Sequence, residues 1–244
     1  MQRPALRLFC LPYSGASAVV YLRWRRSLPA WIEVCPLELP GRGRRFSEPL
    51  QTDMPALVAQ LAAELEGRLD VPYALFGHSL GALLAFELAQ ALRRKGAPAA
   101  RMLFVSGAPA PAHREYHADL RIEQSDEQLL ARLRQLGGTD EAVFQDPEML
   151  LLTLPVLRAD FLLCGRYRYD RRALLGCPIQ AFGGRHDRVS PEALSAWQDE
   201  TAADFSIEMF DGDHFFINAH EARLLELMVE RLQPAGPVQQ PGTA

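Results

Sequence analysis

Short runs of apolar residues alternate along the chain with longer segments whose apolar positions recur every three to four residues. The short runs are bounded by Pro, Gly or Asp, which is typical of buried strands, and the longer segments are typical of amphipathic helices. Strands that alternate with helices predict an α/β fold with a mostly parallel, doubly wound sheet. The predicted strands are Leu6–Leu11, Ile32–Leu37, Tyr73–Phe76, Met102–Val105, Ile179–Phe182 and Ser206–Phe210.

Capping residues mark the helices between these strands. Asp53 is expected to cap a helix that runs to about Arg68. A second helix opens at Ser79 and ends near Lys95, where Gly96 stops it. The later predicted helices are Pro191–Ala202 and Asn218–Leu232.

The alternation is interrupted between the fourth and the fifth predicted strand. Residues 108–172 contain no convincing strand, whereas Asp126–Leu136 and Pro147–Arg158 have helical spacing. We expect a helical lid insertion over one end of the sheet, although additional packing helices without a role at the site would give the same pattern. Residues 1–233 are expected to form one domain, and residues 234–244, rich in Pro, Gly and Gln, a disordered tail.

Composition and charge exclude several classes of function. The chain has 244 residues, which suits one α/β domain, and its 26 Lys and Arg against 30 Asp and Glu give a net charge of −4. No polybasic segment is present, so we expect neither nucleic acid nor a membrane as partner. The apolar runs are shorter than the ~18 residues that cross a bilayer, and a cytoplasmic protein is expected. The widely spaced cysteines predict neither disulfides nor a zinc site: Cys10, Cys35, Cys164 and Cys177.

The sequence Gly77-His78-Ser79-Leu80-Gly81 lies between a predicted strand and a predicted helix. In this context the G-x-S-x-G pattern is a nucleophile elbow, the turn that presents a catalytic serine at the edge of the sheet in α/β-hydrolases. Side chains two residues before and after the serine would clash in so tight a turn, which explains both glycines. The helix N-terminus favours developing negative charge at the serine. We therefore predict an α/β-hydrolase fold with Ser79 as nucleophile.

A nucleophilic serine needs a general base, and six histidines are available. In this fold the base is the last triad member along the chain and follows a late strand. His214 follows the apolar run Ile207–Phe210 and precedes the last helix, which is the expected place. His78 is expected to face away from Ser79, and the remaining histidines lie in the insertion or beside better candidates: His113, His117, His186 and His220.

The base in turn needs a carboxylate that orients it. Asp187 follows the strand Ile179–Phe182 in a Gly-x-x-Asp turn, which places its carboxylate on the same rim of the sheet as Ser79. Asp211 and Asp213 are closer to the histidine in sequence, but a triad assembles in space and not along the chain. We predict Asp187 as the acid.

The tetrahedral intermediate of acyl transfer needs two hydrogen-bond donors for its oxyanion. One is expected to be the backbone N–H of Leu80, the residue after the nucleophile. The other comes from the loop after the first strand, Leu11–Ser17, where Gly15 permits a sharp turn and the Ser14 N–H is the predicted donor. An ordinary turn at the end of a strand is the alternative interpretation of this loop.

Four segments of the chain resemble the stand-alone type II thioesterases that serve non-ribosomal peptide and polyketide synthases. Pro12–Ala16 is similar to the family's Pro-His-Ala-Gly-Gly loop, and Glu38–Gly43 to its Leu/Tyr-Pro-Gly-Arg segment. Gly77–Gly81 resembles its elbow, and Leu157–Phe161 with Tyr167 resembles the end of its lid. These segments are spread over nearly the whole chain, and their combination is far more specific than any one of them.

The chain departs from the family pattern at two places. Tyr13-Ser14 replaces the usual His-Ala, which leaves the Ser14 N–H usable because the donor is backbone. Gly165 stands where many members carry Glu, so no role is carried over for that acid. The run Asp160–Tyr167 is similar to the siderophore branch of the family, of the pyochelin or yersiniabactin kind.

The resemblance implies hydrolysis of acyl or aminoacyl thioesters on the phosphopantetheine arm of a carrier protein, which clears misprimed or stalled carriers and requires no cofactor or metal. The chain contains no Gly-x-Asp-Ser-Leu carrier motif, so an acyl or peptidyl carrier protein would dock in trans. A movable lid suits such an arm, and a monomer is the default expectation. Arginines near the predicted rim offer contacts for an acidic carrier, although solvated surface charge is the simpler explanation: Arg42, Arg44, Arg45, Arg166 and Arg168.

Two alternatives fit the same residues. A fatty-acyl carrier thioesterase or a small-molecule esterase would use the same triad on a different substrate. A catalytically silent α/β-hydrolase that acts as a binding module is disfavoured, because such proteins usually lack a triad member and all three candidates are present here.

Overall fold

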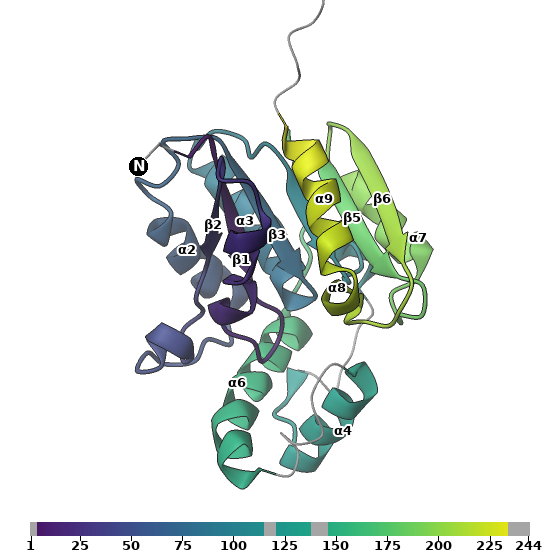
Figure 1. Ribbon diagram of the computed structural model, residues 1–244. Helices are drawn as coiled ribbons and strands as arrows, with labels where there is room; N and C mark the ends of the chain where they lie inside the picture. The colour runs from purple at the N-terminus through teal and green to yellow at the C-terminus, as the bar shows by residue number, and fades with distance from the viewer. Residues whose placement is uncertain (1–3, 115–120, 138–145, 234–244) are drawn as a thin grey trace, which may run out of the picture.

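The computed structural model describes residues 4–114, 121–137 and 146–233. Within these residues the chain forms one six-stranded sheet in the order β2-β1-β3-β4-β5-β6 (Figure 1). All five strand pairings are parallel, as the alternation of strands and helices predicts. The strands are β1 (Leu6–Leu11), β2 (Ile32–Pro36), β3 (Tyr73–His78), β4 (Leu103–Ser106), β5 (Ile179–Gly184) and β6 (Phe205–Phe210).

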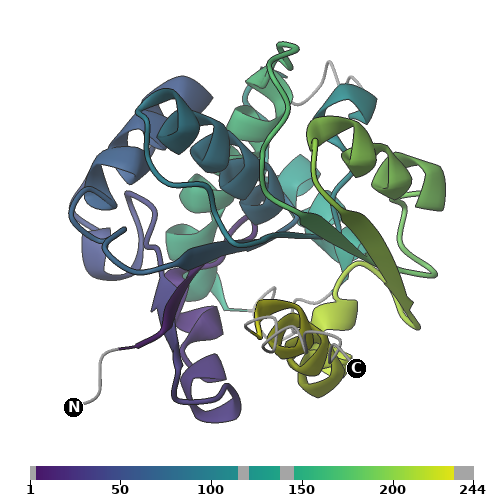
Figure 2. The ribbon, with the colours of Figure 1, turned by 90° about the horizontal axis from the view of Figure 1, so that it is seen from above.

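Helices cover both faces of the sheet (Figure 2). The α-helices of the described ranges are α1 (Trp24–Ser27), α2 (Met54–Glu64), α3 (Leu80–Arg94), α4 (Asp126–Leu136), α6 (Pro147–Arg166), α7 (Pro191–Ser195), α8 (Phe216–Ala219) and α9 (Glu221–Leu232). Short 3₁₀ turns are η1 (Ala18–Tyr21), η2 (Gly43–Arg45), η3 (Pro111–His113) and η5 (Ala196–Glu200). No helix in the described ranges is both long and apolar enough to cross a membrane.

Each face of the sheet has its own apolar core because side chains alternate along a strand. Phe9 and Leu11 of β1 pack with α2, α3 and η5 on one face. Leu8 and Cys10 pack with η1, α1 and α9 on the other face, around Trp24. The order of the strands reverses at β1, whose two neighbours are β2 and β3. In such sheets ligands bind at the carboxyl ends of the strands beside this reversal.

The predicted strands are all present, and their ends differ by one or two residues. β3 extends to His78 and β5 to Gly184, beyond the predicted Phe76 and Phe182. His and Gly are weak strand formers, but both segments continue because the neighbouring strands pair with them in register. Asp53 caps α2 as predicted, through a bond from the Ala56 N–H at 2.8 Å.

Several helix ends differ from the predictions. α2 ends at Glu64 and not near Arg68. The segment predicted as one helix over Pro191–Ala202 is α7 followed by the 3₁₀ turn η5, and α9 is separated from α8 at His220, inside the range predicted as a single helix. In each case the periodic apolar pattern continues past the residue where the backbone hydrogen bonding changes, so this pattern does not predict where the helix ends.

The segment between β4 and β5 carries helices and no strand in the residues that the structure describes. α4 spans the predicted Asp126–Leu136, and α6 continues to Arg166, beyond the predicted Arg158. Residues Ala159–Leu163 are buried on every side, so the polar stripe that reveals a surface helix is lost there. α4 and the first half of α6 project from the carboxyl end of the sheet (Figure 1). The predicted tail at 234–244 lies outside the described residues.

His78, at the end of β3, is the histidine most enclosed by the fold. Its side chain has no exposed surface, and its Nδ1 lies 2.9 Å from the Ser106 hydroxyl oxygen. The rings of Tyr13 and His214 pack against it, with centroids at 5.8 and 4.9 Å. Burial lowers the pKa of His78 well below its usual value, and the nearby His214 lowers it further. The fold therefore holds His78 neutral.

This burial predicts a specific loss of stability in acid. The unfolded chain binds a proton at His78 with a pKa near ~6.5, whereas the folded chain does not, so stability falls as the pH drops below that value. Between pH 7.5 and pH 5 the wild type should lose about 2 kcal/mol more unfolding free energy than His78→Asn. Urea unfolding at the two pH values measures this difference, with His113→Asn at an exposed histidine as control. Equal pH dependence of wild type and His78→Asn would contradict the assignment.

Candidate active site

Ser79 occupies a strained turn between β3 and α3. Its φ of 54° is positive, which makes it unique among the non-glycine residues that the structure describes. The Ser79 N–H donates to the carbonyl oxygen of Ser106 at 2.8 Å, which holds this conformation at the end of the sheet. Strain of this kind is kept only where the surroundings enforce it, and it clusters at functional sites.

Steric contacts require glycine at both ends of the elbow, Gly77 and Gly81. A Cβ on Gly77 would lie 1.9 Å from the carbonyl oxygen of Gly81, and one on Gly81 would lie 2.2 Å from the carbonyl oxygen of Leu11. The first contact closes the turn, and the second packs the start of α3 against the end of β1. The register of the sheet places Leu11 beside Gly77, so the loop after β1 lies next to the elbow.

His214 and Asp187 meet at the other side of the same sheet edge. The Nδ1 of His214 lies 2.9 Å from Oδ2 of Asp187. Both side chains are largely withdrawn from solvent, with 10 % and 3 % of their surfaces exposed. A carboxylate bonded to Nδ1 fixes the imidazole tautomer that leaves Nε2 as proton acceptor.

Backbone bonds connect the loops that carry these two residues. The register pairs Gly184 of β5 with Phe210 of β6, so both loops leave the sheet at the same point. The N–H groups of Arg185 and His186 donate to the carbonyl oxygens of Phe210 and Gly212, at 2.8 and 3.0 Å. The Asp187 N–H donates to the Gly184 carbonyl oxygen at 3.2 Å and closes the predicted turn. The relative position of Asp187 and His214 is thus fixed by main-chain hydrogen bonds.

The elbow and the His214 loop are neighbours, although no hydrogen bond joins Ser79 to His214 in the described part of the chain. The ring of His78, the residue before Ser79, packs against the His214 ring with a centroid distance of 4.9 Å. Hydrogen bonds of catalytic residues are often long in unliganded enzymes and shorten on substrate binding. The structure therefore brings all three predicted residues to one edge, with the Asp187–His214 pair formed.

The predicted oxyanion donors lie on the two adjoining segments. Leu80 is the first residue of α3, so its N–H has no acceptor within the helix. In the loop after β1, the Gly15 N–H donates to Oδ2 of Asp160 at 2.8 Å, whereas the Ser14 N–H donates to no group in the described residues. The Ser14 N–H, which the sequence predicts as an oxyanion donor, is therefore available to a ligand, whereas the Gly15 N–H is not.

The remaining predicted residues have other surroundings. Arg42, expected near the rim, is 6 % exposed and paired with Asp160, so it does not offer a surface charge. Arg45 is also paired inward, with Glu48 at 2.6 Å. All four cysteines are free. His186 and His220 are not part of the triad arrangement, His113 lies in η3, and His117 lies outside the described residues.

Sequence reasoning missed the charged residues that hold the loop after β1. Asp160 is fully buried in α6, and Glu38 is 4 % exposed and accepts the Ala18 N–H at 2.9 Å. A Cβ on Gly43 would lie 2.0 Å from Glu38, so the carboxylate fills the space that this glycine leaves. Acidic residues inside apolar or Gly-rich segments were the signal, because such groups are buried only when they are paired.

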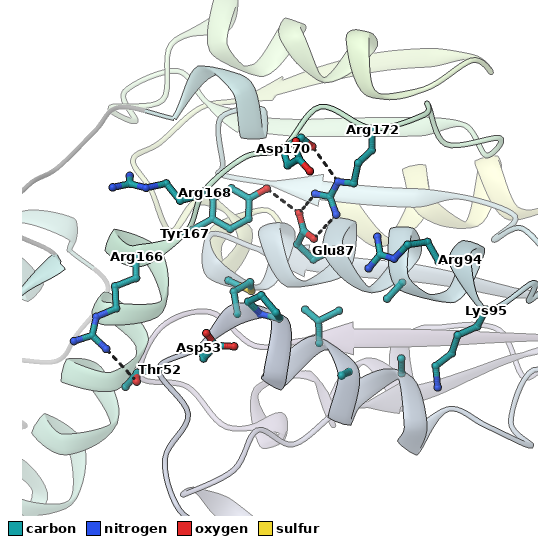
Figure 3. A pocket seen from close by; sticks show the side chains of 16 residues that line it. Thr52, Asp53, Glu87, Arg94, Lys95, Arg166, Tyr167, Arg168, Asp170 and Arg172 are labelled. Atoms are coloured by element: carbon teal, nitrogen blue, oxygen red, sulfur yellow. Dashed lines mark hydrogen bonds and ion pairs between the residues drawn. The ribbon is translucent and has the colours of Figure 1, made fainter.

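A pocket of about 610 Å³ lies between α2, α3 and the segment that follows α6 (Figure 3). The carboxylate of Glu87 pairs there with Arg172 and accepts from the Tyr167 hydroxyl at 2.8 Å. Burial raises the pKa of Tyr167, and the Glu87 charge adds to the rise. None of the predicted triad or oxyanion residues lines this pocket. Within the described ranges no group of three His, Cys, Asp or Glu residues is arranged to hold a metal ion.

Comparisons with known proteins identify relatives of the whole arrangement. The gramicidin S biosynthesis protein GrsT of Aneurinibacillus migulanus is 42 % identical over 93 % of this chain and 89 % of its own length. The RedJ thioesterase of the prodiginine pathway in Streptomyces coelicolor has a TM-score of 0.88 and 41 % identity, covering 94 % of this chain and 87 % of RedJ. The type II thioesterase BorB of the borrelidin cluster has a TM-score of 0.86 and 38 % identity, covering 95 % of this chain and 96 % of BorB.

A type II thioesterase of the yersiniabactin pathway matches at 28 % identity and a TM-score of 0.83, over 95 % of this chain and 94 % of its own. This is lower than the values for RedJ and BorB, so the predicted resemblance to the siderophore branch is not confirmed. The α/β-hydrolase fold is confirmed by these thioesterase structures. A model of the thioesterase domain family matches residues 6–232, nearly the full length. With the elbow, the paired acid and base and this match in agreement, the chain belongs to the thioesterase domain family.

Proposed function

We propose that this thioesterase hydrolyses acyl or aminoacyl thioesters carried on the phosphopantetheine arms of carrier proteins, as a stand-alone editing enzyme of non-ribosomal peptide or polyketide synthesis. The Asp187–His214 pair beside the strained Ser79 is the observation that carries the chemistry. The relatives support the substrate class: RedJ is a thioesterase of prodiginine biosynthesis, BorB is a type II thioesterase of the borrelidin cluster, and the yersiniabactin relative is a type II thioesterase of a non-ribosomal peptide and polyketide pathway.

The mechanism follows from the positions of the side chains. Nε2 of His214 takes the proton of Ser79 Oγ as this oxygen attacks the thioester carbonyl carbon. The carbonyl oxygen becomes an oxyanion that accepts hydrogen bonds from the backbone N–H groups of Leu80 and Ser14. Asp187 accepts from Nδ1 throughout and stabilises the imidazolium without taking its proton. The C–S bond then breaks, and the proton on Nε2 passes to the departing thiolate.

Water completes the cycle by the same groups. His214 removes a proton from water, whose oxygen attacks the acyl carbon of the acyl-Ser79 ester. The second oxyanion occupies the same two donors, and its collapse releases the carboxylic acid while the proton returns to Ser79 Oγ. A thiolate leaves readily, so positioning and oxyanion stabilisation are the main contributions of the protein.

The insertion at residues 108–172 is proposed to form the lid of this site within a single domain of residues 1–233. α4 and the first half of α6 project from the carboxyl end of the sheet, which supports a role in covering the acyl chain (Figure 1). The second half of α6 is buried against the main core through Leu163. This supports a lid whose motion is confined to the part before that anchor.

The carrier protein is proposed to dock in trans, with the enzyme acting as a cytoplasmic monomer without a cofactor. Its own sequence has no Gly-x-Asp-Ser-Leu carrier motif, and Ser79 lies in a turn at the carboxyl end of the sheet, where the arm of a docked carrier would enter. With Arg42 buried, the candidates for contact with an acidic carrier are the more exposed arginines such as Arg44, whose side chain is 64 % exposed.

Replacing Ser79 by Ala removes the nucleophile and should lower kcat for deacylation of acyl-loaded carrier protein by about 10⁴-fold or more. The substitution deletes one oxygen atom, so the thermal midpoint should stay near that of the wild type. Release of the acid from a radiolabelled acetyl-carrier protein measures the rate. Deacylation at the wild-type rate would exclude Ser79 as nucleophile.

The choice of Asp187 over acids nearer to His214 is tested by matched substitutions. Asp187→Asn should lower kcat by about 10²- to 10⁴-fold, because an amide no longer holds the Nδ1–H tautomer or stabilises the imidazolium. Asp211→Asn alters a side chain that is 79 % exposed, and its kcat should stay within about twofold of the wild type. A larger loss in Asp211→Asn than in Asp187→Asn would reverse the assignment.

The substrate class is tested by comparing three acetyl donors: acetyl-loaded carrier protein, the acetyl thioester of N-acetylcysteamine, and p-nitrophenyl acetate. Binding of the carrier and its arm should raise kcat/KM for the loaded carrier at least about tenfold over the truncated thioester. Steady-state rates on the three substrates give the ratios. A preference for p-nitrophenyl acetate would instead favour a small-molecule esterase, and activity only on long fatty-acyl carriers a fatty-acyl thioesterase.

A further inference from the structure

Asp160 of α6 is a fully buried carboxylate that contacts the loop after β1. Its Oδ2 accepts the Gly15 N–H at 2.8 Å and Nη1 of Arg42 at 2.7 Å, and its Oδ1 accepts Nη2 of Arg42 at 2.6 Å. A buried ion pair is in general weak evidence for a contribution to stability, because desolvation of the charges offsets their attraction. Stability alone therefore does not explain why a buried carboxylate binds the Gly15 N–H in a loop of the candidate site.

The same pair holds the loop on both sides of Gly15. Besides pairing with Asp160, Nη1 of Arg42 donates to the carbonyl oxygen of Ala16 at 3.2 Å. The Asp160 carboxylate thus fixes the peptide group between Ser14 and Gly15, and the Arg42 guanidinium fixes the carbonyl group of Ala16. The loop is clamped at its turn by two charged groups that neutralise each other.

α6 contacts this loop along one face. A Cβ on Gly15, whose φ is +80°, would lie 2.7 Å from Leu157, and the Ser14 side chain acts to lower the pKa of the Cys164 thiol, which burial raises. Leu157, Asp160 and Cys164 are spaced three and four residues apart, so they line one side of the helix. The opposite end of the loop is fixed by Gly81 against the Leu11 carbonyl oxygen. Ser14 lies between these two anchors.

These contacts decide which N–H group of the loop is available. With the Gly15 N–H bound to Asp160, the Ser14 N–H is left to donate to an oxyanion together with the N–H of Leu80. Arg42 also neutralises the charge of Asp160. An unpaired carboxylate bonded to this loop would raise the energy of the negative charge that develops on the oxyanion. The pair therefore orients the loop without opposing the charge that the loop must stabilise.

We propose that Asp160 is a positioning residue for catalysis, which holds the Ser14 N–H in the oxyanion hole through its bond to Gly15 and its pair with Arg42. This inference rests on the proposed function, in which Ser14 supplies one oxyanion donor. It makes the second half of α6 a fixed wall of the catalytic site, so that the lid and the oxyanion hole share one helix.

Asp160→Asn tests the proposal with p-nitrophenyl acetate as substrate. Loss of one ordered oxyanion donor should lower kcat by about 100-fold while KM stays within about threefold of the wild type. A trifluoromethyl ketone inhibitor mimics the tetrahedral intermediate. Ser79 Oγ adds to its carbonyl carbon, the serine proton passes to His214, and the ketone oxygen becomes an oxyanion in the oxyanion hole. Its inhibition constant should rise by the factor by which kcat/KM falls, an agreement that general loss of structure would not produce.

Glu87→Gln is the matched control, because Glu87 is also a buried acid paired with an arginine, Arg172, but it does not contact the loop after β1. Its kcat should equal that of the wild type even where its thermal midpoint falls. Arg42→Lys keeps the charge but loses the two-point pairing, and its kcat should fall by about tenfold. If Asp160→Asn does not fold, Arg42→Lys tests the proposal in its place: its kcat should fall while its KM stays near that of the wild type.

The outcomes separate this inference from the proposed function. An unchanged kcat in folded Asp160→Asn, a loss confined to KM, or an equal loss of kcat in Glu87→Gln would overturn the inference. If Ser79→Ala abolishes hydrolysis while Asp160→Asn keeps its kcat, only the positioning role fails. If Ser79→Ala keeps its activity, the proposed function itself fails.

Discussion

Steric contact between the turn after β3 and the end of β1 sets the half of the candidate site that contains Ser79. Gly81 approaches the Leu11 carbonyl oxygen so closely that no side chain fits between them, and Gly77 approaches Gly81 in the same way. This packing forces the positive φ of Ser79 and sets the first turn of α3 beside the loop after β1. Ser79, the proposed nucleophile, and the Leu80 N–H, a proposed oxyanion donor, are therefore positioned by close backbone contacts at the edge where the strand order reverses.

The other half of the site is built by main-chain bonds between loops. The acid follows β5 and the base follows β6, and the parallel register brings both loops to the same edge. Because the turn at Asp187 is bonded to the loop before His214, the pair is preorganised before substrate binds. Buried His78, a residue of the elbow, packs against His214, and its neutrality avoids a second positive charge beside the imidazolium that the proposed mechanism forms.

Much of this arrangement is predictable from sequence, for identifiable reasons. Strand and helix order follow from apolar periodicity, and the elbow from two glycines at fixed spacing around Ser79. The pairing of Asp187 with His214, over Asp211 and Asp213, follows from the rule that carboxyl ends of parallel strands share an edge. The burial of Arg42 was missed, because a charged residue next to other arginines has the pattern of a solvated surface.

Its partner Asp160 lies 118 residues away, and only the fold brings the two together. The extent of α6 was underestimated for a related reason: a segment buried on all sides loses the amphipathic stripe by which a helix is recognised. Local patterns thus predict the elements and the residues that the fold brings to one edge of the sheet. The contacts that orient those groups depend on long-range packing, and they appear only in the structure.

The central claim is that an acyl group passes through Ser79, and rapid-quench mass spectrometry of the intact protein tests it most directly. Acetyl-loaded carrier protein mixed with the enzyme and quenched in acid should give a fraction with the added mass of one acetyl group in place of a hydrogen, located by peptide mapping to Ser79. Hydrolysis that proceeds with the acetyl group on another residue would contradict the account.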